Sequence, residues 1–141
     1  MKVSKILKVD NKFNFEAPVL KASTKLNKQL STKINSERID LNEMLIPKPE
    51  DIFLVKVNGD SMIGSMILDG DILIVDKKQK AKDGDIVVSS LNGEMTVKTF
   101  KMIENKAYLF SSNEKFLPIE LSELFRFEIQ GVVKHVIRNT D

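Results

Sequence analysis

Residues 85–98 read DIVVSSLNGEMTVK and carry the strongest folding signal in the chain. Two apolar, β-branched runs flank Asn92-Gly93, a pair that is typical of a tight β-hairpin turn because both central residues of that turn need a positive φ. The pattern predicts a strand over 85–90 and a return strand over 94–100. An antiparallel pair is therefore the first structural element that the sequence predicts.

More short strands are predicted on both sides of this hairpin. Turns that contain glycine or aspartate separate runs rich in Ile, Val, Leu and Phe, which span 52–57, 71–76, 106–111 and 125–138. Gly131 interrupts the last run, where we expect a kink or bulge. Residues 119–124 suggest a short turn of helix. The predicted fold class is mainly β, a compact, curled or barrel-like antiparallel sheet.

The N-terminal quarter of the chain differs from this body in charge and composition. Of 141 residues with a net charge of +2, residues 1–36 hold eight lysines against two acidic residues, and all six glycines lie at or after Gly59. We therefore expect a flexible, extended basic arm over 1–37 and a β domain over 38–141. Asp40 is the predicted N-cap of a short helix at the start of that domain.

Composition excludes several classes of function. The chain has no cysteine and one histidine, so a thiol nucleophile is excluded. Lysines interrupt the first residues, which predicts neither a signal peptide nor a membrane span, and we expect a cytoplasmic protein. No phosphate-loop or zinc motif is present, so no cofactor and no metal are expected. Nor does the arm have the pattern of a helix-turn-helix, which argues against direct sequence-specific DNA binding.

Ser61 and Lys98 are the candidate catalytic residues. Ser61 lies in the turn Gly59-Asp60-Ser61-Met62 after a predicted strand, where the backbone N–H groups of Ser61 and Met62 can serve as oxyanion donors. Lys98 follows 37 residues later on a predicted strand. A lysine amine in apolar surroundings loses its charge and can act as a base. The alternatives are a serine that only supports the turn and a solvated lysine.

Three other residues have competing interpretations. His135 suggests a catalytic triad, but no acidic partner is apparent at any telling spacing, which favours a structural histidine. Asp60 and Asp69 could be metal ligands, yet each adjoins a glycine turn where aspartate commonly bonds the backbone.

From residue 38 onward the chain resembles the LexA-type self-cleaving peptidases and, among them, the UmuD-like accessory subunits of error-prone polymerases. The resemblance rests on the stretches Arg38–Asn42, Gly59–Met62, Asp69–Asp76, Gly84–Val87, Gly93–Lys98 and Gly131–Val136. It implies Ser61 as nucleophile, Lys98 as general base and a curled β body. It also implies a homodimer that cuts its own N-terminal arm when stimulated by a RecA–single-stranded DNA filament in the SOS response, and then joins a UmuC-type DNA polymerase for translesion synthesis.

The expected substrate segment departs from this family. Such proteins usually cut between Ala or Cys and Gly, and this chain has no glycine before Gly59. The best substitute is Ala22-Ser23, which lies after the apolar pair Val19-Leu20 and 39 residues before Ser61. If the arm of this chain is a poor substrate, the protein has an alternative function. It is then a non-cleaving dimeric interaction module that binds polymerase or RecA, as in a mobile-element or phage relative.

Overall fold

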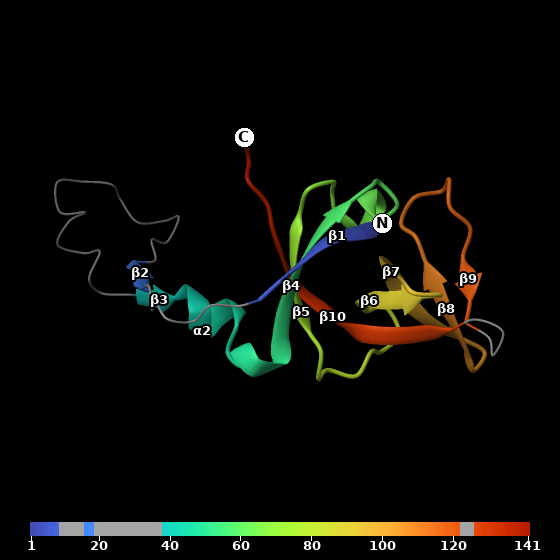
Figure 1. Ribbon diagram of the computed structural model, residues 1–141, viewed down its shortest axis with the longest axis horizontal. Coiled ribbons are helices and arrows are strands. Elements are labelled where there is room, and N and C mark those ends of the chain that lie inside the picture. Colours follow the sequence, from blue (N-terminus) through green and yellow to red (C-terminus); the bar gives the residue numbers. More distant parts are fainter. Residues whose placement is uncertain (9–15, 19–37, 122–125) are drawn as a thin grey trace. The chain divides into compact units, whose positions relative to one another are not determined.

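The computed structural model describes residues 1–8, 16–18, 38–121 and 126–141 (Figure 1). The chain divides into two compact units, residues 10–49 and the larger unit of residues 1–9 and 50–141. In the smaller unit, strands β2 (Glu16–Pro18) and β3 (Arg38–Asp40) pair antiparallel, and helix α2 (Leu41–Leu45) follows.

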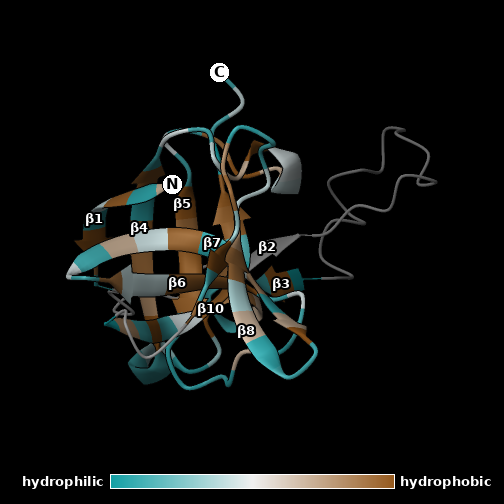
Figure 2. Cartoon of the chain, turned by 90° about the vertical axis from the view of Figure 1, so that its right-hand side faces the viewer, coloured by the Kyte–Doolittle hydropathy of each residue, from teal (hydrophilic) through white to brown (hydrophobic). Residues whose placement is uncertain are grey.

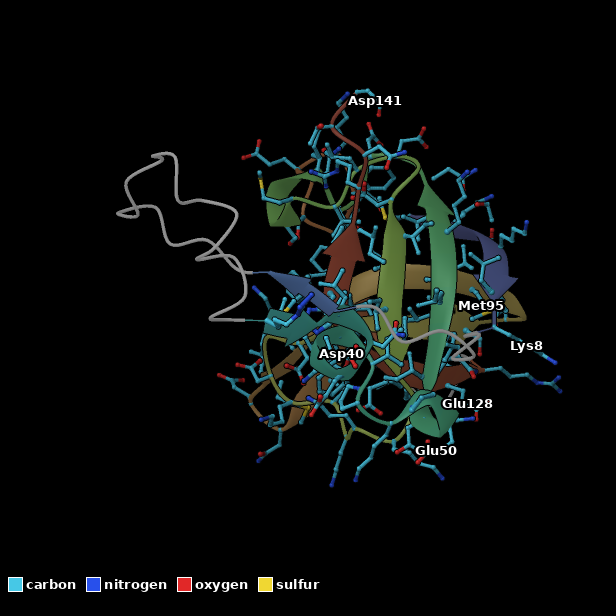
Figure 3. All side chains as sticks on the ribbon, turned by 90° about the vertical axis from the view of Figure 1, so that its left-hand side faces the viewer. Lys8, Asp40, Glu50, Met95, Glu128 and Asp141 are labelled. Atoms are coloured by element: carbon cyan, nitrogen blue, oxygen red, sulfur yellow. The ribbon has the colours of Figure 1, made fainter. Side chains whose placement is uncertain are left out.

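Asp40 begins helix α2 as predicted (Figure 3). Its carboxylate accepts hydrogen bonds from the backbone N–H groups of Asn42 and Glu43, at 2.9 and 3.2 Å. These groups belong to the first turn, where a helix has no backbone acceptors of its own. The predicted N-cap is confirmed.

The larger unit is a closed antiparallel β-barrel, which confirms the predicted fold class. Its sheet has the strand order β1-β4-β5-β10-β6-β7-β8-β9, and an additional pairing of β1 with β7 closes the first six strands into a ring (Figure 1). Two 3₁₀ turns, η2 and η3, lie at Pro49–Asp51 and Ile63–Ser65. The strands are β1 (Lys2–Leu7), β4 (Ile52–Asn58), β5 (Ile72–Asp76), β6 (Ile86–Leu91), β7 (Glu94–Ile103), β8 (Lys106–Phe110), β9 (Ile119–Glu120) and β10 (Phe127–Ile137).

Strand β1 corrects the expectation of one flexible arm over 1–37. It pairs with β4 from Lys2 opposite Asn58 to Leu7 opposite Leu54, so it is part of the barrel wall. A register shift between Val3 and Lys5 breaks the two-residue alternation by which a strand is recognised in a sequence. The rest of that arm, apart from β2, lies outside the described residues, and the expected boundary at 37/38 does not coincide with the limits of the two compact units.

The hairpin of β6 and β7 is confirmed, whereas the turn of helix over 119–124 is wrong where it can be checked. Asn92 and Gly93 have φ values of 51° and 84°, as their tight turn requires. Residues 119 and 120 form β9, which pairs with Leu109 and Tyr108 of β8. Ile119 packs against a buried apolar cluster, and this tertiary contact decides its conformation. Residues 122–125 lie outside the described part of the chain.

Two apolar clusters form the core. Hydrophobic residues gather along the barrel strands (Figure 2), with every second residue buried at the end of β4 and three consecutive residues, Leu73 to Val75, buried in β5. A smaller cluster is formed by Val87, Leu109 and Val132. The larger cluster contains Met1, Val55, Val57, Met62, Ile67, Leu73, Val75, Val88 and Val97.

Gly131 bulges β10, as expected. The register of β10 against β6 shifts between Ile129 and Gly131. A Cβ atom at Gly131 would lie 2.7 Å from the backbone oxygen of Asp76 in β5, a separation that real Cβ atoms essentially never show. The barrel therefore needs glycine here to let β10 and β5 approach each other.

We predict that Gly131→Ala lowers the free energy of unfolding by about 1–3 kcal/mol, because either β5 or β10 must move. Gly93→Ala is the control. A Cβ atom at Gly93 would meet no atom within 4 Å, so the cost of this substitution comes only from the positive φ of the backbone. Urea unfolding of both variants gives the comparison. Equal stability of Gly131→Ala and the parent chain would show that the close approach is not a constraint.

Candidate active site

The turn that carries Ser61 is held rigidly at both ends. Gly59, with a φ of +103°, leaves strand β4, and its N–H donates to Asp69 Oδ1 at 2.9 Å. Asp69 thus serves the turn, as expected of an aspartate beside glycine. Ser61 is 2% exposed, and the next residue, Met62, is fully buried in the larger apolar cluster. Burial of Met62 fixes the backbone on which the serine hydroxyl is mounted.

An ion pair secures the loop that follows Ser61. Arg138, next to the end of β10, donates from Nε and Nη2 to the buried carboxylate of Asp71 at 2.7 and 2.6 Å, and from Nη2 to the backbone oxygen of Met66 at 2.7 Å. Asp71 also accepts from the N–H of Leu68. The hydrogen bond from Arg138 holds the pKa of the Asp71 carboxyl below its usual range, so Asp71 stays charged and the loop stays tied to β10.

Lys98 is a buried lysine in the wall of the barrel. It lies on β7 opposite Val87 and is 8% exposed. Its Nζ donates to Ser111 Oγ at 2.7 Å and lies 6.0 Å from the centroid of the Phe116 ring. Burial lowers the pKa of the amine. Of the two alternatives for this residue, a solvated lysine and a buried one, the structure shows the buried one.

Met1 forms hydrogen bonds with Ser61 and with Val97, the residue before Lys98. Its α-amine donates a hydrogen bond to Ser61 Oγ, and its backbone oxygen accepts from Val97 N, the neighbour of Lys98, at 2.9 Å. The pKa of this α-amine is lowered to about 6, mainly by burial and secondly by the charge of Lys98. Ser61 and Lys98 thus adjoin the same amine, while each has its own hydrogen-bond partner, the α-amine for Ser61 and Ser111 for Lys98.

Two hollows adjoin the serine. The first has a volume of about 290 Å³ and is lined by Met1, Lys2, Asn58, Gly59, Asp60, Ser61 and Phe116. The second shares Gly59 and Asp60 with the first, and its apolar wall is formed by Ile63 and Leu68. Both side chains are partly exposed. Ser61 itself lines the first hollow, and the second lies beside it across Gly59 and Asp60.

The remaining candidates lie elsewhere. His135 is half-buried on β10 opposite Ile74 and lines neither hollow, in keeping with a structural role. Within the described residues, no group of three or more His, Asp or Glu side chains could hold a metal ion. None of the helices in the described part of the chain is long and apolar enough to cross a membrane. Ala22 and Ser23 fall outside the described residues.

Sequence reasoning did not find Met1 or Ser111. Met1 reaches the site because β1 closes the barrel, which the weak alternation of residues 2–7 did not reveal. Ser111 is the last residue of the strand predicted over 106–111, but β8 ends at Phe110, and nothing in the local pattern indicates a contact with Lys98. Only the pairing of β7 with β8, which places Thr99 opposite Phe110, brings it near Lys98.

The amino-acid sequence of this chain is similar to those of known proteins. The Peptidase S24-like family model matches residues 18–134. LexA repressors are similar to this chain: that of Actinobacillus succinogenes is 43% identical over 94 residues, 65% of this chain and 45% of the relative. That of Vibrio atlanticus is 37% identical over 109 residues, 74% and 53% of the two chains. The chain spans about half the length of the curated relatives it matches.

Lys98→Met is predicted to stabilise the fold at pH 7 by on the order of 1 kcal/mol, since a functional site commonly costs stability. Because the amine has a lowered pKa in the folded chain and ~10.4 when unfolded, the unfolded chain binds more protons in the pH range between these two pKa values. The stability of the parent chain therefore rises with pH, and the advantage of the variant shrinks toward pH 10.

Urea unfolding at several pH values measures this effect, and Lys56→Met at an exposed position of β4 controls for replacing a strand lysine. A lower free energy of unfolding for Lys98→Met than for the parent chain at pH 7 would contradict this prediction, because it would mean that Lys98 stabilises the fold.

Proposed function

The chain belongs to the Peptidase S24-like family, and we propose that it is a serine peptidase that cuts its own chain, with Ser61 as nucleophile and Lys98 as general base. The observation that carries this proposal is that Ser61 and Lys98 are both buried, while Met1 bonds the hydroxyl of Ser61 and the backbone N–H of Val97, next to Lys98. Burial lowers the pKa of the Lys98 amine, so at a given pH more of it is neutral than of a solvated lysine.

The proposed reaction uses the Ser61 hydroxyl, the Lys98 amine and backbone N–H groups of the turn that carries Ser61. Lys98 Nζ takes the hydroxyl proton as Ser61 Oγ attacks the carbonyl carbon of the scissile bond. Within the described residues, the N–H groups of Ser61 and Met62 have no acceptor, whereas those of Ile63 and Gly64 bond Asp60 and Ser112. The two free N–H groups are the proposed oxyanion donors. The Lys98 ammonium then gives its proton to the leaving amine, and water hydrolyses the acyl-enzyme.

For attack, the Ser61 hydroxyl must exchange its contact with the Met1 α-amine for one with Lys98. Withdrawal of Met1 also opens the larger part of the hollow beside Ser61, which Met1 and Lys2 line. We therefore place removal of the chain end from the site before substrate binding in the proposed sequence of events.

The finer role that we propose is that of a UmuD-like protein of the SOS response. The sequence blocks given above support this role, and the LexA repressors are relatives by similarity. In this proposal a homodimer in the cytoplasm, stimulated by a RecA–DNA filament, cuts between Ala22 and Ser23 and then serves a UmuC-type polymerase. The cut would remove five lysines and two acidic residues and change the net charge from +2 to −1, which alters the choice of partner.

One observation favours a second candidate, a non-cleaving interaction module. The α-amine of Met1 contacts the serine hydroxyl, and the Met1 side chain is buried in the barrel core, so the chain itself covers the nucleophile. In that case the barrel acts as a dimeric platform for polymerase or RecA.

Incubation of the purified chain between pH 7 and 10, with and without RecA, single-stranded DNA and nucleotide, separates the two candidates. We expect two fragments whose masses add up to that of the parent chain plus one water, and a rate that rises with pH through the lowered pKa of Lys98. Intact-mass spectrometry identifies the bond.

Ser61→Ala and Lys98→Ala are both expected to abolish the cut, and His135→Ala is the control that retains it. A cut that persists in either of the first two variants rules out the Ser61–Lys98 pair. No cut under any condition, with polymerase binding retained, favours the interaction module.

A further inference from the structure

The segment Ser111–Asn113, which directly follows β8, contacts both Lys98 and the turn that carries Ser61. We call this segment the clasp. Ser111 Oγ accepts the hydrogen bond from Lys98 Nζ at 2.7 Å. On the other side, Asn113 Nδ2 donates to the backbone oxygen of Asp60, the residue before the nucleophile, at 3.1 Å. One short segment thus joins the base to the turn of the nucleophile.

The clasp fits closely against the turn η3. The N–H of Gly64 donates to the backbone oxygen of Ser112 at 2.6 Å, and the hydroxyls of Ser65 and Ser112 also form a hydrogen bond. A Cβ atom at Gly64 would lie 2.3 Å from that same oxygen. Such close backbone packing leaves the clasp little freedom to move relative to Ser61, so the position of Ser111 is fixed as well.

Ser111 restricts an otherwise flexible side chain. A neutral lysine amine has two N–H groups and one lone pair, and it rotates about four side-chain bonds. Phe116, the other contact of the amine, offers a ring face and fixes no direction. The hydroxyl of Ser111 binds one N–H and so restricts where the lone pair points. A base must meet its proton at hydrogen-bond distance, so this restriction bears directly on proton transfer.

We propose that Ser111 is a positioning residue that holds the Lys98 amine in place for proton transfer from Ser61, an inference that rests on the proposed function. Ser111 acts through Lys98 and does not contact the reacting carbonyl. As an acceptor it also stabilises the ammonium form over the neutral amine and partly offsets the effect of burial. The other titratable groups that line the hollow beside Ser61 are the Met1 α-amine, which precedes β1, the amine of Lys2 in β1 and the carboxyl of Asp60 in the turn of the proposed nucleophile.

The direct test is the titration of Lys98 Nζ by NMR in the full chain labelled with ¹³C,¹⁵N-lysine, with Lys98→Met to assign the signal. We expect Ser111→Ala to lower the pKa of Lys98 further, because the acceptor is lost, and Ser111→Thr to restore the parent value. Ser89→Ala, at another buried serine, is the control that leaves the titration unchanged. Identical titration of Lys98 in Ser111→Ala and the parent chain would overturn the proposal. This readout requires no cleavage.

The rate of self-cleavage provides the second readout. We expect Ser111→Ala to reduce the plateau rate about 10- to 100-fold and to move the midpoint of the pH profile downward, with Ser111→Thr near the parent. An unchanged rate and midpoint in Ser111→Ala would overturn positioning even if the NMR titration shifts. If the parent chain is never cut, the proposed function fails, while the NMR titration still decides whether Ser111 governs the Lys98 amine.

Discussion

The site depends on one costly constraint, the burial of a lysine amine in the wall of a barrel. Lys98 lies on a central part of β7 and is 8% exposed, with one hydroxyl as its hydrogen-bond partner and, within the described residues, no carboxylate among its contacts. In such surroundings burial favours the neutral amine. The rest of the proposed site follows from this requirement, because a carboxylate in place of Ser111 would favour the charged amine and disable the proposed base.

Closure of the barrel places a second amine beside the same serine. Strand β1 fills the gap between β4 and β7, and its register brings Lys2 opposite Thr96. The preceding residue, Met1, is therefore carried onto Ser61. Closure of the barrel by β1 thus also covers the hydroxyl of Ser61, and exposure of this hydroxyl depends on the residue that precedes β1.

The local parts of this structure were predictable from the sequence, and the long-range parts were not. The Asn92-Gly93 hairpin, the Asp40 cap and the bulge at Gly131 each follow from the backbone preferences of single residues. Closure by β1 and the contact of Ser111 with Lys98 depend on pairings between strands distant in sequence. Residues 119 and 120 illustrate the same limit, because Ile119 joins a strand through its packing and not through its local pattern. Likewise Ser61 and Lys98 were identifiable as a pair, but their surroundings were not.

The most direct test of the claim that Lys98 activates Ser61 is the pH dependence of Ser61 labelling by a fluorophosphonate, followed by mass spectrometry of the full chain. The label needs no arm and no scissile bond. The account predicts labelling that rises through a single midpoint below the ordinary lysine value of ~10.4 and is lost in Lys98→Ala. Labelling that persists in Lys98→Ala with a midpoint near 6, the pKa of the Met1 α-amine, would contradict it and identify that amine as the base.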